Sequence, residues 1–301
     1  MGKPNSHQLN TKNLRISVVL NLAIAVAEVV GGMLANSLSL LSDALHNLGD
    51  GLALLFAYIA NRVSRRDATD KKTFGYKRIE ILSAFINSMV LIAISVYLFV
   101  EAIKRFYNPA TIDSTIMLVV ASIGLVANVI SVLILHKDSA HNLNIKAAYL
   151  HLIGDTLSSV VVIIGGVLIY FYDLYWIDPA VTILIGIYIL KEAIAIVKET
   201  LNILMQSTPE GIDLRDVKDE VEKLPGINNI HHVHTWALNE NQFHFEAHVD
   251  LEKDMAVSES TLMQQKIEKM LYDKFDFAHV TLQFEYDTCD EKHLVNNHKI
   301  E

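Results

Sequence analysis

Two histidine–aspartate pairs are the residues of this sequence best suited to bind a metal ion. The stretch LHNLGDGL contains His46 and Asp50, and the stretch LHLIGDTL contains His151 and Asp155, so both follow the pattern L-H-x-x-G-D-x-L. Residues four apart on a helix lie on the same face, one turn apart. Each pair therefore presents an imidazole and a carboxylate in one direction. Two such pairs facing each other supply four nitrogen and oxygen ligands, the tetrahedral set that suits zinc.

Both pairs lie inside long apolar segments. The chain has 301 residues, of which 51% are hydrophobic, and its mean hydropathy is +0.31. A helix needs about 20 apolar residues to cross a bilayer. Segments of that length predict a membrane α-helical bundle of six transmembrane helices, at 14–35, 38–60, 79–100, 115–136, 147–171 and 177–197. We therefore expect a short cytoplasmic segment at 1–13 and a lipid-embedded domain at 14–205.

The basic residues predict the orientation of the bundle, because cytoplasmic loops carry an excess of lysine and arginine. The basic side includes the loop between the second and third segments, which carries Arg62, Arg65, Arg66, Lys71, Lys72, Lys77 and Arg78. The loops on the opposite side of the membrane carry only Lys104 and Arg105. An even number of spans then places both termini in the cytoplasm, as in a multi-pass protein of the cell membrane.

The two pairs are expected at the same depth. At a rise of 1.5 Å per residue, His46 and Asp50 lie roughly 12 and 18 Å below the outer surface. The fifth segment runs the other way, which puts His151 and Asp155 at about 24 and 18 Å in a core of about 30 Å. One polar residue in a span is equally well explained by a hydrogen bond between helices. Two pairs at one level favour a metal site, because unpaired carboxylates in a membrane are costly, and Asp43 is an accessory candidate.

The last third of the chain has the composition of a soluble, acidic domain. Residues 1–206 carry a net charge of +2 and residues 207–301 a net charge of −11, for a total of −9. The single cysteine, Cys289, excludes an internal disulfide framework and fits a reducing compartment. No nucleic-acid partner is expected.

The periodicity of this part predicts a small α/β domain at 206–290, followed by a flexible tail at 291–301. The expected elements are a helix, two strands, a helix and a strand, at 212–224, 229–238, 242–251, 257–274 and 278–286. The order αββαβ predicts a ferredoxin-like fold.

Eight of the 13 histidines lie in this part of the chain. Alternation along the first strand puts His232 and His234 on one face and His231 on the other. The second strand puts His244, Glu246 and His248 on one face. Together with Glu285 and Cys289, this cluster could form a borderline or soft metal site, although for any single histidine a solvated surface position is the alternative.

Several stretches of the chain resemble one known family, the cation diffusion facilitators, and in particular its bacterial zinc/cadmium/cobalt efflux branch. The stretches that carry the resemblance are NSLSLLSDALHNLGD at 36–50, TFGYKR at 73–78, NLNIKAAYLH at 142–151 and HHVHTW at 231–236. The resemblance implies a homodimeric, proton-coupled exporter of divalent transition metals in a bacterial inner membrane. It also implies that the two histidine–aspartate pairs form the transport site.

The same resemblance implies a metallochaperone-like cytoplasmic domain that dimerises and binds regulatory metal. By strand position, His231, His248 and Glu285 match the family's ligands in this domain, and His279 is one residue away from the expected place. Some members carry a further metal site in the loop after the second span. Here the corresponding positions are Lys72 and Tyr76, so that site is not expected.

Two other classes of protein would also use a buried metal site. A membrane metalloenzyme would need an open coordination position and a general base, but we find no base beyond the ligands and no H-E-x-x-H motif. A metal sensor would leave four ionisable residues at the membrane midplane without a purpose. A transporter rather than an enzyme or a sensor is therefore expected. Proton coupling fits this expectation, because neutral histidine and ionised aspartate bind metal in competition with protons.

Overall fold

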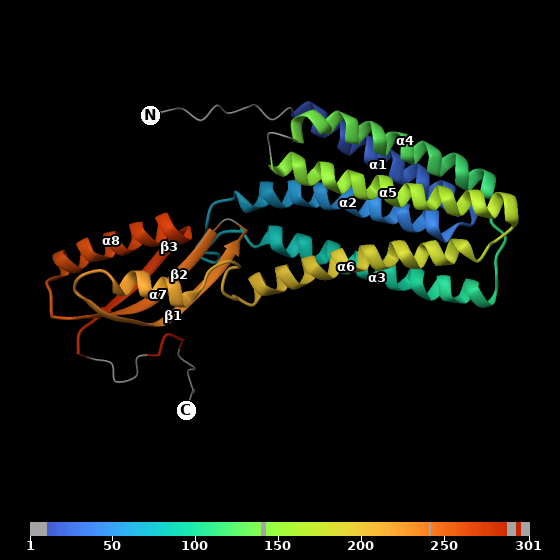
Figure 1. Ribbon diagram of the computed structural model, residues 1–301. Coiled ribbons are helices and arrows are strands. Elements are labelled where there is room, and N and C mark those ends of the chain that lie inside the picture. Colours follow the sequence, from blue (N-terminus) through green and yellow to red (C-terminus); the bar gives the residue numbers. More distant parts are fainter. Residues whose placement is uncertain (1–10, 140–142, 241, 288–292, 296–301) are drawn as a thin grey trace. The chain divides into compact units, whose positions relative to one another are not determined.

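Six long helices and a small α/β domain make up the computed structural model, which describes residues 11–139, 143–240, 242–287 and 293–295. Figure 1 shows the helices running as an elongated bundle. Their bounds are α1 Thr11–Ala35, α2 Leu38–Ser64, α3 Ile79–Tyr107, α4 Ser114–Ser139, α5 Leu143–Tyr172 and α6 Ile177–Leu204. All six apolar segments are therefore helices, and each helix extends beyond or matches the limits expected from hydropathy.

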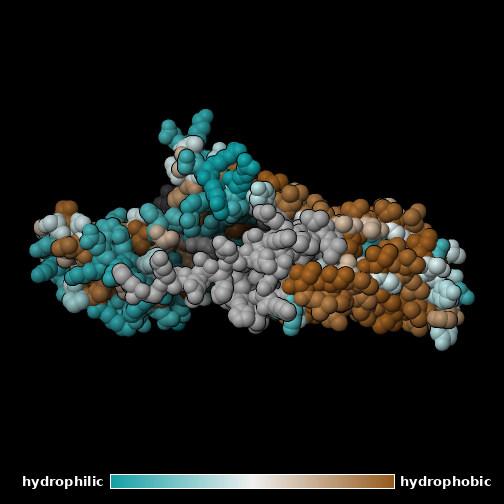
Figure 2. Space-filling model, turned by 90° about the horizontal axis from the view of Figure 1, so that it is seen from above, coloured by the Kyte–Doolittle hydropathy of each residue, from teal (hydrophilic) through white to brown (hydrophobic). Residues whose placement is uncertain are grey.

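Four of the described helices are long and apolar enough to cross a membrane. They cover Ile79–Tyr107, Ser114–Ile134, Tyr149–Tyr172 and Ile177–Leu204. Apolar side chains such as Leu133 and Tyr97 are mostly exposed on the outside of the bundle, whereas Glu28, Asp43 and Asn128 are buried inside it. Where the helices are drawn in colour, Figure 2 shows mostly hydrophobic residues on the visible face. Apolar outside and polar inside is the distribution expected of a bundle surrounded by lipid.

The chain divides into two compact units. The first unit comprises residues 1–59 and 83–197, and the second comprises 60–82 and 198–301. Within the first unit, α4 packs against both α1 and α5. The Cβ-free face of Gly186 lets α6 approach Phe99 of α3. The loop between α2 and α3 thus belongs to the same unit as the α/β domain.

The start of α2 is fixed by one local feature and one contact from a distant helix. Asn36 adopts a left-handed conformation (φ 55°) and ends α1, and the Ser37 N–H donates to the Gly32 carbonyl at 3.0 Å. The buried carboxylate of Asp178, at the beginning of α6, then accepts hydrogen bonds from the backbone N–H groups of Leu38 and Ser39 at 2.8 and 3.1 Å. A carboxylate from another helix thereby caps α2.

The α/β domain consists of α7 Leu214–Glu222, β1 Ile227–Asn239, β2 Gln242–Leu251, α8 Val257–Phe275 and β3 Phe277–Glu285. The three strands form one sheet in the order β1-β2-β3, with β1 antiparallel and β3 parallel to β2. Buried residues of both helices pack with the strands in one core that includes Val221, Phe245, Ile267 and Phe277. The predicted order αββαβ is confirmed, whereas the ferredoxin-like assignment stays a prediction.

Simple alternation along β1 was the wrong expectation around His232. The register between β1 and β2 shifts between His231 and His234, and His232 has a positive φ of 53°. This bulge adds a residue to one strand and re-aims the side chains beside it. The rings of His231 and His232 both lie beside His248, with centroid distances of 5.5 and 4.5 Å.

Candidate metal centre

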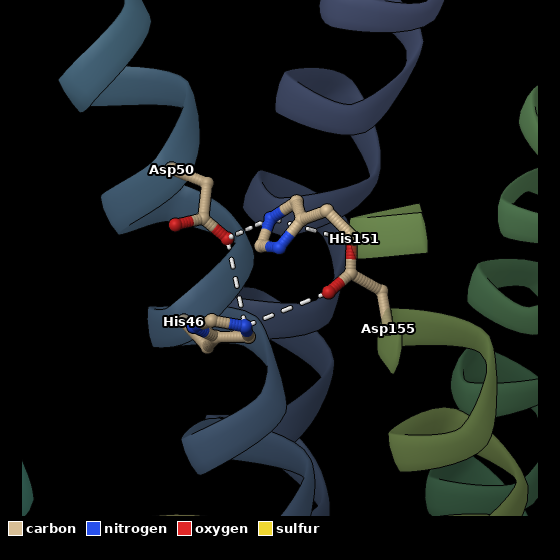
Figure 3. Close-up of side chains that lie close together, drawn as sticks. All are labelled: His46, Asp50, His151 and Asp155. Atoms are coloured by element: carbon tan, nitrogen blue, oxygen red, sulfur yellow. Dashed lines mark hydrogen bonds and ion pairs between the residues drawn. The ribbon is translucent and has the colours of Figure 1, made fainter. Parts of the chain in front are cut away.

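The two histidine–aspartate pairs converge inside the helical unit. Figure 3 shows His46 and Asp50 on α2 pointing toward His151 and Asp155 on α5. One nitrogen of each histidine and one oxygen of each aspartate all lie within 4.8 Å of one another. The interhelical distances are 3.0 Å from His151 Nε2 to Asp50 Oδ2 and 3.5 Å from His46 Nε2 to Asp155 Oδ1.

The spacing of these four atoms matches the size of a tetrahedral metal site. A zinc ion with bonds of about 2.0–2.1 Å holds its ligand atoms roughly 3.3 Å apart. The pairs within each helix are separated by 3.5 Å on α2 and 3.8 Å on α5. Small side-chain adjustments would therefore complete a tetrahedron around one ion.

The burial of the four side chains is uneven. His46 and Asp155 are 4% and 1% exposed, whereas Asp50 and His151 are 26% and 37% exposed. Both ring nitrogens of His46 and both carboxylate oxygens of Asp155 are buried and make no hydrogen bond within the described residues. Buried polar atoms without partners are expensive. A bound cation would satisfy them, and the more exposed pair marks the side from which it can enter.

A tyrosine on α6 closes one side of the cluster. The ring of Tyr188 stands edge-on to the ring of His46, with centroids 6.1 Å apart. A Cβ atom at Gly154 would lie 3.1 Å from the Tyr188 hydroxyl oxygen. The glycine beside Asp155 therefore makes room for Tyr188, which restricts the orientation of the His46 ring.

Asp43, the accessory candidate, is buried but lies outside the group of four. Its carboxylate accepts hydrogen bonds from the hydroxyl groups of Ser158 and Ser159, the second at 3.1 Å. It therefore connects α2 to α5 next to the cluster. One turn further along α2, the Asn47 amide donates to the buried Glu28 carboxylate of α1 at 3.0 Å.

A second cluster of possible ligands lies in the α/β domain. His231, His248 and Glu285 come from the three strands, and one ligand atom of each lies within 4.8 Å of the others. Glu285 is 2.7 Å from His248 Nδ1 and 3.4 Å from His231 Nε2. Burial lowers the pKa of His231, so this ring is held in the neutral form that can bind metal.

The other described candidates of the α/β domain do not join this cluster. His279 pairs in register with His244, six residues from Glu285 along β3, or about 20 Å away. The rings of His279 and His244 are 5.0 Å apart. His232 and His234 lie with ring centroids 5.1 Å apart, outside the three-residue group. Cys289 lies outside the described residues.

Sequence reasoning missed the residues that support the cluster in the helical unit. Neither Tyr188 nor Asp178 belongs to a repeated motif. Tyr188 lies in an apolar run, and Asp178 precedes a proline typical of a turn. The only sequence signal for Asp178 was its position as an acidic residue at the start of the sixth apolar segment. Glu28 was visible as a charge within a span, but its partner was not.

Fold and site together define the class: a multi-pass membrane protein whose helical interior gathers histidine and aspartate side chains of the kind that bind metal ions. Residues 14–205 match the family described as the cation efflux transmembrane domain, and residues 209–287 match the cation efflux protein cytoplasmic domain. The chain belongs to the cation efflux family, as the sequence motifs predicted.

Relatives of known annotation cover nearly the whole chain. It is 39% identical to the metal cation efflux system protein CzcD of Cupriavidus metallidurans over 97% of this chain and 92% of the relative. It is 41% identical to the cadmium, cobalt and zinc/H(+)-K(+) antiporter of Bacillus subtilis, over 98% and 95% of the two chains. Identity to the zinc transporter ZitB of Escherichia coli is 35%, over 93% and 89%. These relatives are transport proteins rather than enzymes.

Proposed function

We propose that this protein exports divalent transition metal ions from the cytoplasm in exchange for protons, with zinc as the main substrate and cadmium and cobalt as further ones. The observation that carries the proposal is the convergence of four ligand atoms from α2 and α5 within 4.8 Å. The names of the relatives, which include zinc, cadmium and cobalt transport and an antiporter, support it.

The ligand set accounts for the choice of metal. Two imidazoles and two carboxylates suit zinc and similar borderline ions in tetrahedral geometry. Magnesium demands octahedral oxygen coordination, and calcium takes six to eight oxygen ligands. A cluster in which half of the ligands are nitrogen atoms therefore selects against both of these abundant ions.

Proton exchange follows from the same four side chains. A metal ion binds neutral His46 and His151 and ionised Asp50 and Asp155, so each protonation competes with the metal. Imidazole titrates close to neutral pH, and protons can therefore occupy the histidines when the metal has left. If the site opens alternately to each side of the membrane, the outward release of metal is coupled to the inward return of protons.

The topology and assembly complete this proposal. All six helices cross a bacterial inner membrane, both termini and the domain at 206–290 lie in the cytoplasm, and two copies of the chain pair through that domain. The domain has a ferredoxin-like, metallochaperone-like fold, and metal bound by His231, His248 and Glu285 regulates transport. The short distances from His231 and His248 to the Glu285 carboxylate support metal binding by these three residues.

Zinc flux into proteoliposomes tests the proposal. Vesicles that carry the whole chain and a pH-sensitive dye should accumulate zinc against a proton gradient and release protons as they do so. Replacing both carboxylates, Asp50→Ala with Asp155→Ala, should lower the flux more than about 100-fold, because loss of outer partners alone costs 10–100-fold in metal affinity or activity. The control is the pair Asp67→Ala and Asp70→Ala, two exposed carboxylates in the loop after α2.

Four results would contradict the proposal. Zinc flux that survives in the double variant rules out the site. Zinc flux without proton movement rules out the exchange. Metal binding without any flux in sealed vesicles favours a sensor, and metal-dependent turnover of a substrate in its place favours an enzyme.

A further inference from the structure

A pocket of about 550 Å³ lies in the second unit, and none of its lining residues belongs to either candidate metal site. The loop between α2 and α3, the start of α3, the end of α6 and strand β1 surround it. Its exposed wall is mainly apolar, and three basic residues are among those that line it; the lining residues include Lys72, Lys77, Arg78, Phe74, Leu204 and Trp236. Neither the export reaction nor the two metal clusters uses these residues.

The cations of the pocket have no carboxylate partner within the described residues. The ammonium group of Lys72 lies 4.1 Å from the ring centroid of Tyr76, and the Lys77 ammonium donates to the Gln242 side-chain oxygen at 2.5 Å. The Nε of Arg78 is buried and makes no hydrogen bond in the described part of the chain. Three basic residues therefore line one pocket with no carboxylate ion pair among the described residues, which is a composition that attracts an anion.

These charges also act on a nearby histidine. The pKa of His244 is lowered first by burial and then by the positive fields of His279, Lys77 and Arg78. The rings of Phe74 and Trp236 both pack against His244, at centroid distances of 5.4 and 5.3 Å. The aromatic contacts attach the loop to β1 and β2.

The apolar part of the wall belongs to helices that cross the membrane. The helices α3 and α6 are both long and apolar enough to do so, and the pocket includes Ile79 and Leu82 at the start of α3 and Leu204 at the end of α6. The side chains of Phe74 and Leu82 are 52% and 46% exposed. The ends of such helices lie at the level of the lipid headgroups, where basic and aromatic residues gather.

We propose that this pocket binds one anionic phospholipid of the adjoining leaflet. Its phosphate would pair with Lys77 and Arg78, and its acyl chain would follow Leu82 and Leu204. A free phosphate ion would match only the cations, and a neutral lipid would match only the apolar wall. An amphiphile with a negative headgroup matches both the cations and the apolar wall, and it would neutralise Arg78, whose Nε is buried.

Fluorescence quenching of Trp236 tests this proposal on the whole chain. The protein has two tryptophans, so the Trp176→Phe variant leaves Trp236 as the only reporter. The variant is placed in phosphatidylcholine nanodiscs that contain a small fraction of either brominated phosphatidylglycerol or brominated phosphatidylcholine. Stronger quenching by the phosphatidylglycerol probe at the same fraction is expected.

Charge removal then separates a built site from general attraction to anionic lipid. A cation near a membrane surface contributes about fivefold to binding an anionic lipid, so Lys77→Gln with Arg78→Gln should raise the half-quenching fraction roughly 25-fold. The matched control is Arg62→Gln with Arg65→Gln, which removes the same charge from the end of α2 and the start of the following loop, outside the pocket. This control should keep the original half-quenching fraction.

Three outcomes overturn the lipid site: equal quenching by both brominated lipids, an equal loss in the control pair, or recovery of fluorescence on adding inorganic phosphate. The last outcome would assign the cations to a soluble anion. A Leu204→Glu variant provides an independent check if the double variant fails to fold, because a carboxylate in the apolar wall should also abolish selective quenching. Zinc flux is not part of the readout, so this result does not depend on the proposed transport.

Discussion

The replacement Asp178→Asn should destabilise the helical unit more than its small size suggests. The carboxylate of Asp178 is fully buried. One of its oxygens accepts from the hydroxyl groups of Ser37 and Ser39 at 2.6 and 2.7 Å and from the Ser39 N–H. The other accepts from the Leu38 N–H at 2.8 Å and lies 3.7 Å from the Arg105 guanidinium. Both oxygens therefore face donors.

An amide cannot reproduce this arrangement, because only one of its two ends accepts. In either orientation its NH₂ group faces a backbone N–H of α2, so one charge-assisted hydrogen bond worth about 1.5–3 kcal/mol is lost. Arg105 also loses its charged partner, and breaking a buried pair costs about 3–5 kcal/mol. Because Arg105 still donates to the carbonyl and side-chain oxygens of Asn36 at 2.5 and 2.8 Å, the two costs overlap. We expect a loss of about 3 kcal/mol in the free energy of unfolding.

Equilibrium unfolding in mixed detergent micelles measures this loss. The Trp236→Phe background leaves Trp176 as the only tryptophan, two positions before Asp178. The matched control is Asp173→Asn, an exposed carboxylate whose left-handed φ of 54° suits asparagine. The control should change the free energy of unfolding by no more than about 0.5 kcal/mol. If the two variants unfold alike, Asp178 does not hold α2 in place and the reasoning is refuted.

Three further predictions concern the two candidate metal sites. Gly154→Ala should weaken zinc binding in a chelator competition, because its Cβ would displace the Tyr188 hydroxyl; Gly165→Ala, whose nearest contacts are 3.4 Å away, should have no such effect. In the presence of chelator, the second unit should lose stability in urea as the pH falls below 6.5. The reason is that burial lowers the pKa of His231 below this ordinary value, so the unfolded chain takes up the proton first; stability that is independent of pH would contradict it. Glu285→Gln should reduce the zinc retained per chain from two ions to one by elemental analysis, and full retention would exclude this carboxylate as a ligand.

Helix positions were predictable from the sequence, but some helix ends were not. Hydropathy located the start of α2 at Leu38, and then placed its end at residue 60, whereas the helix continues to Ser64. The end of α3 shifts similarly, from residue 100 to Tyr107, just before Asn108-Pro109. Apolar composition reports the thickness of the bilayer core, while a helix ends only where its backbone hydrogen bonding ends. Polar residues such as Asn61 and Arg62 leave the lipid without leaving the helix.

The four residues at the centre of the site were predictable because the pattern occurs twice and each copy uses a helical spacing. The residues around them lack such a signal. The bulge at His232 depends on a local backbone conformation with a positive φ, which strand alternation does not encode. The contact between Tyr188 and Gly154 depends on how closely α6 approaches α5, and nothing in one sequence specifies that distance.

The supporting contacts constrain how α2 can move while it carries half of the site. Its first turn is bound by Asp178 of α6, its second turn by the hydrogen bonds of Asp43 to α5, and its third turn by the bond from Asn47 to Glu28 of α1. Sliding α2 by one turn, about 5.4 Å, would break all three sets of buried hydrogen bonds together. A tilt that pivots about the Asp178 end can preserve the cap and much of the α2–α5 pairing. Because His46 and Asp155 are buried and Asp50 and His151 are partly exposed, such a tilt could change access to the ligands without separating them.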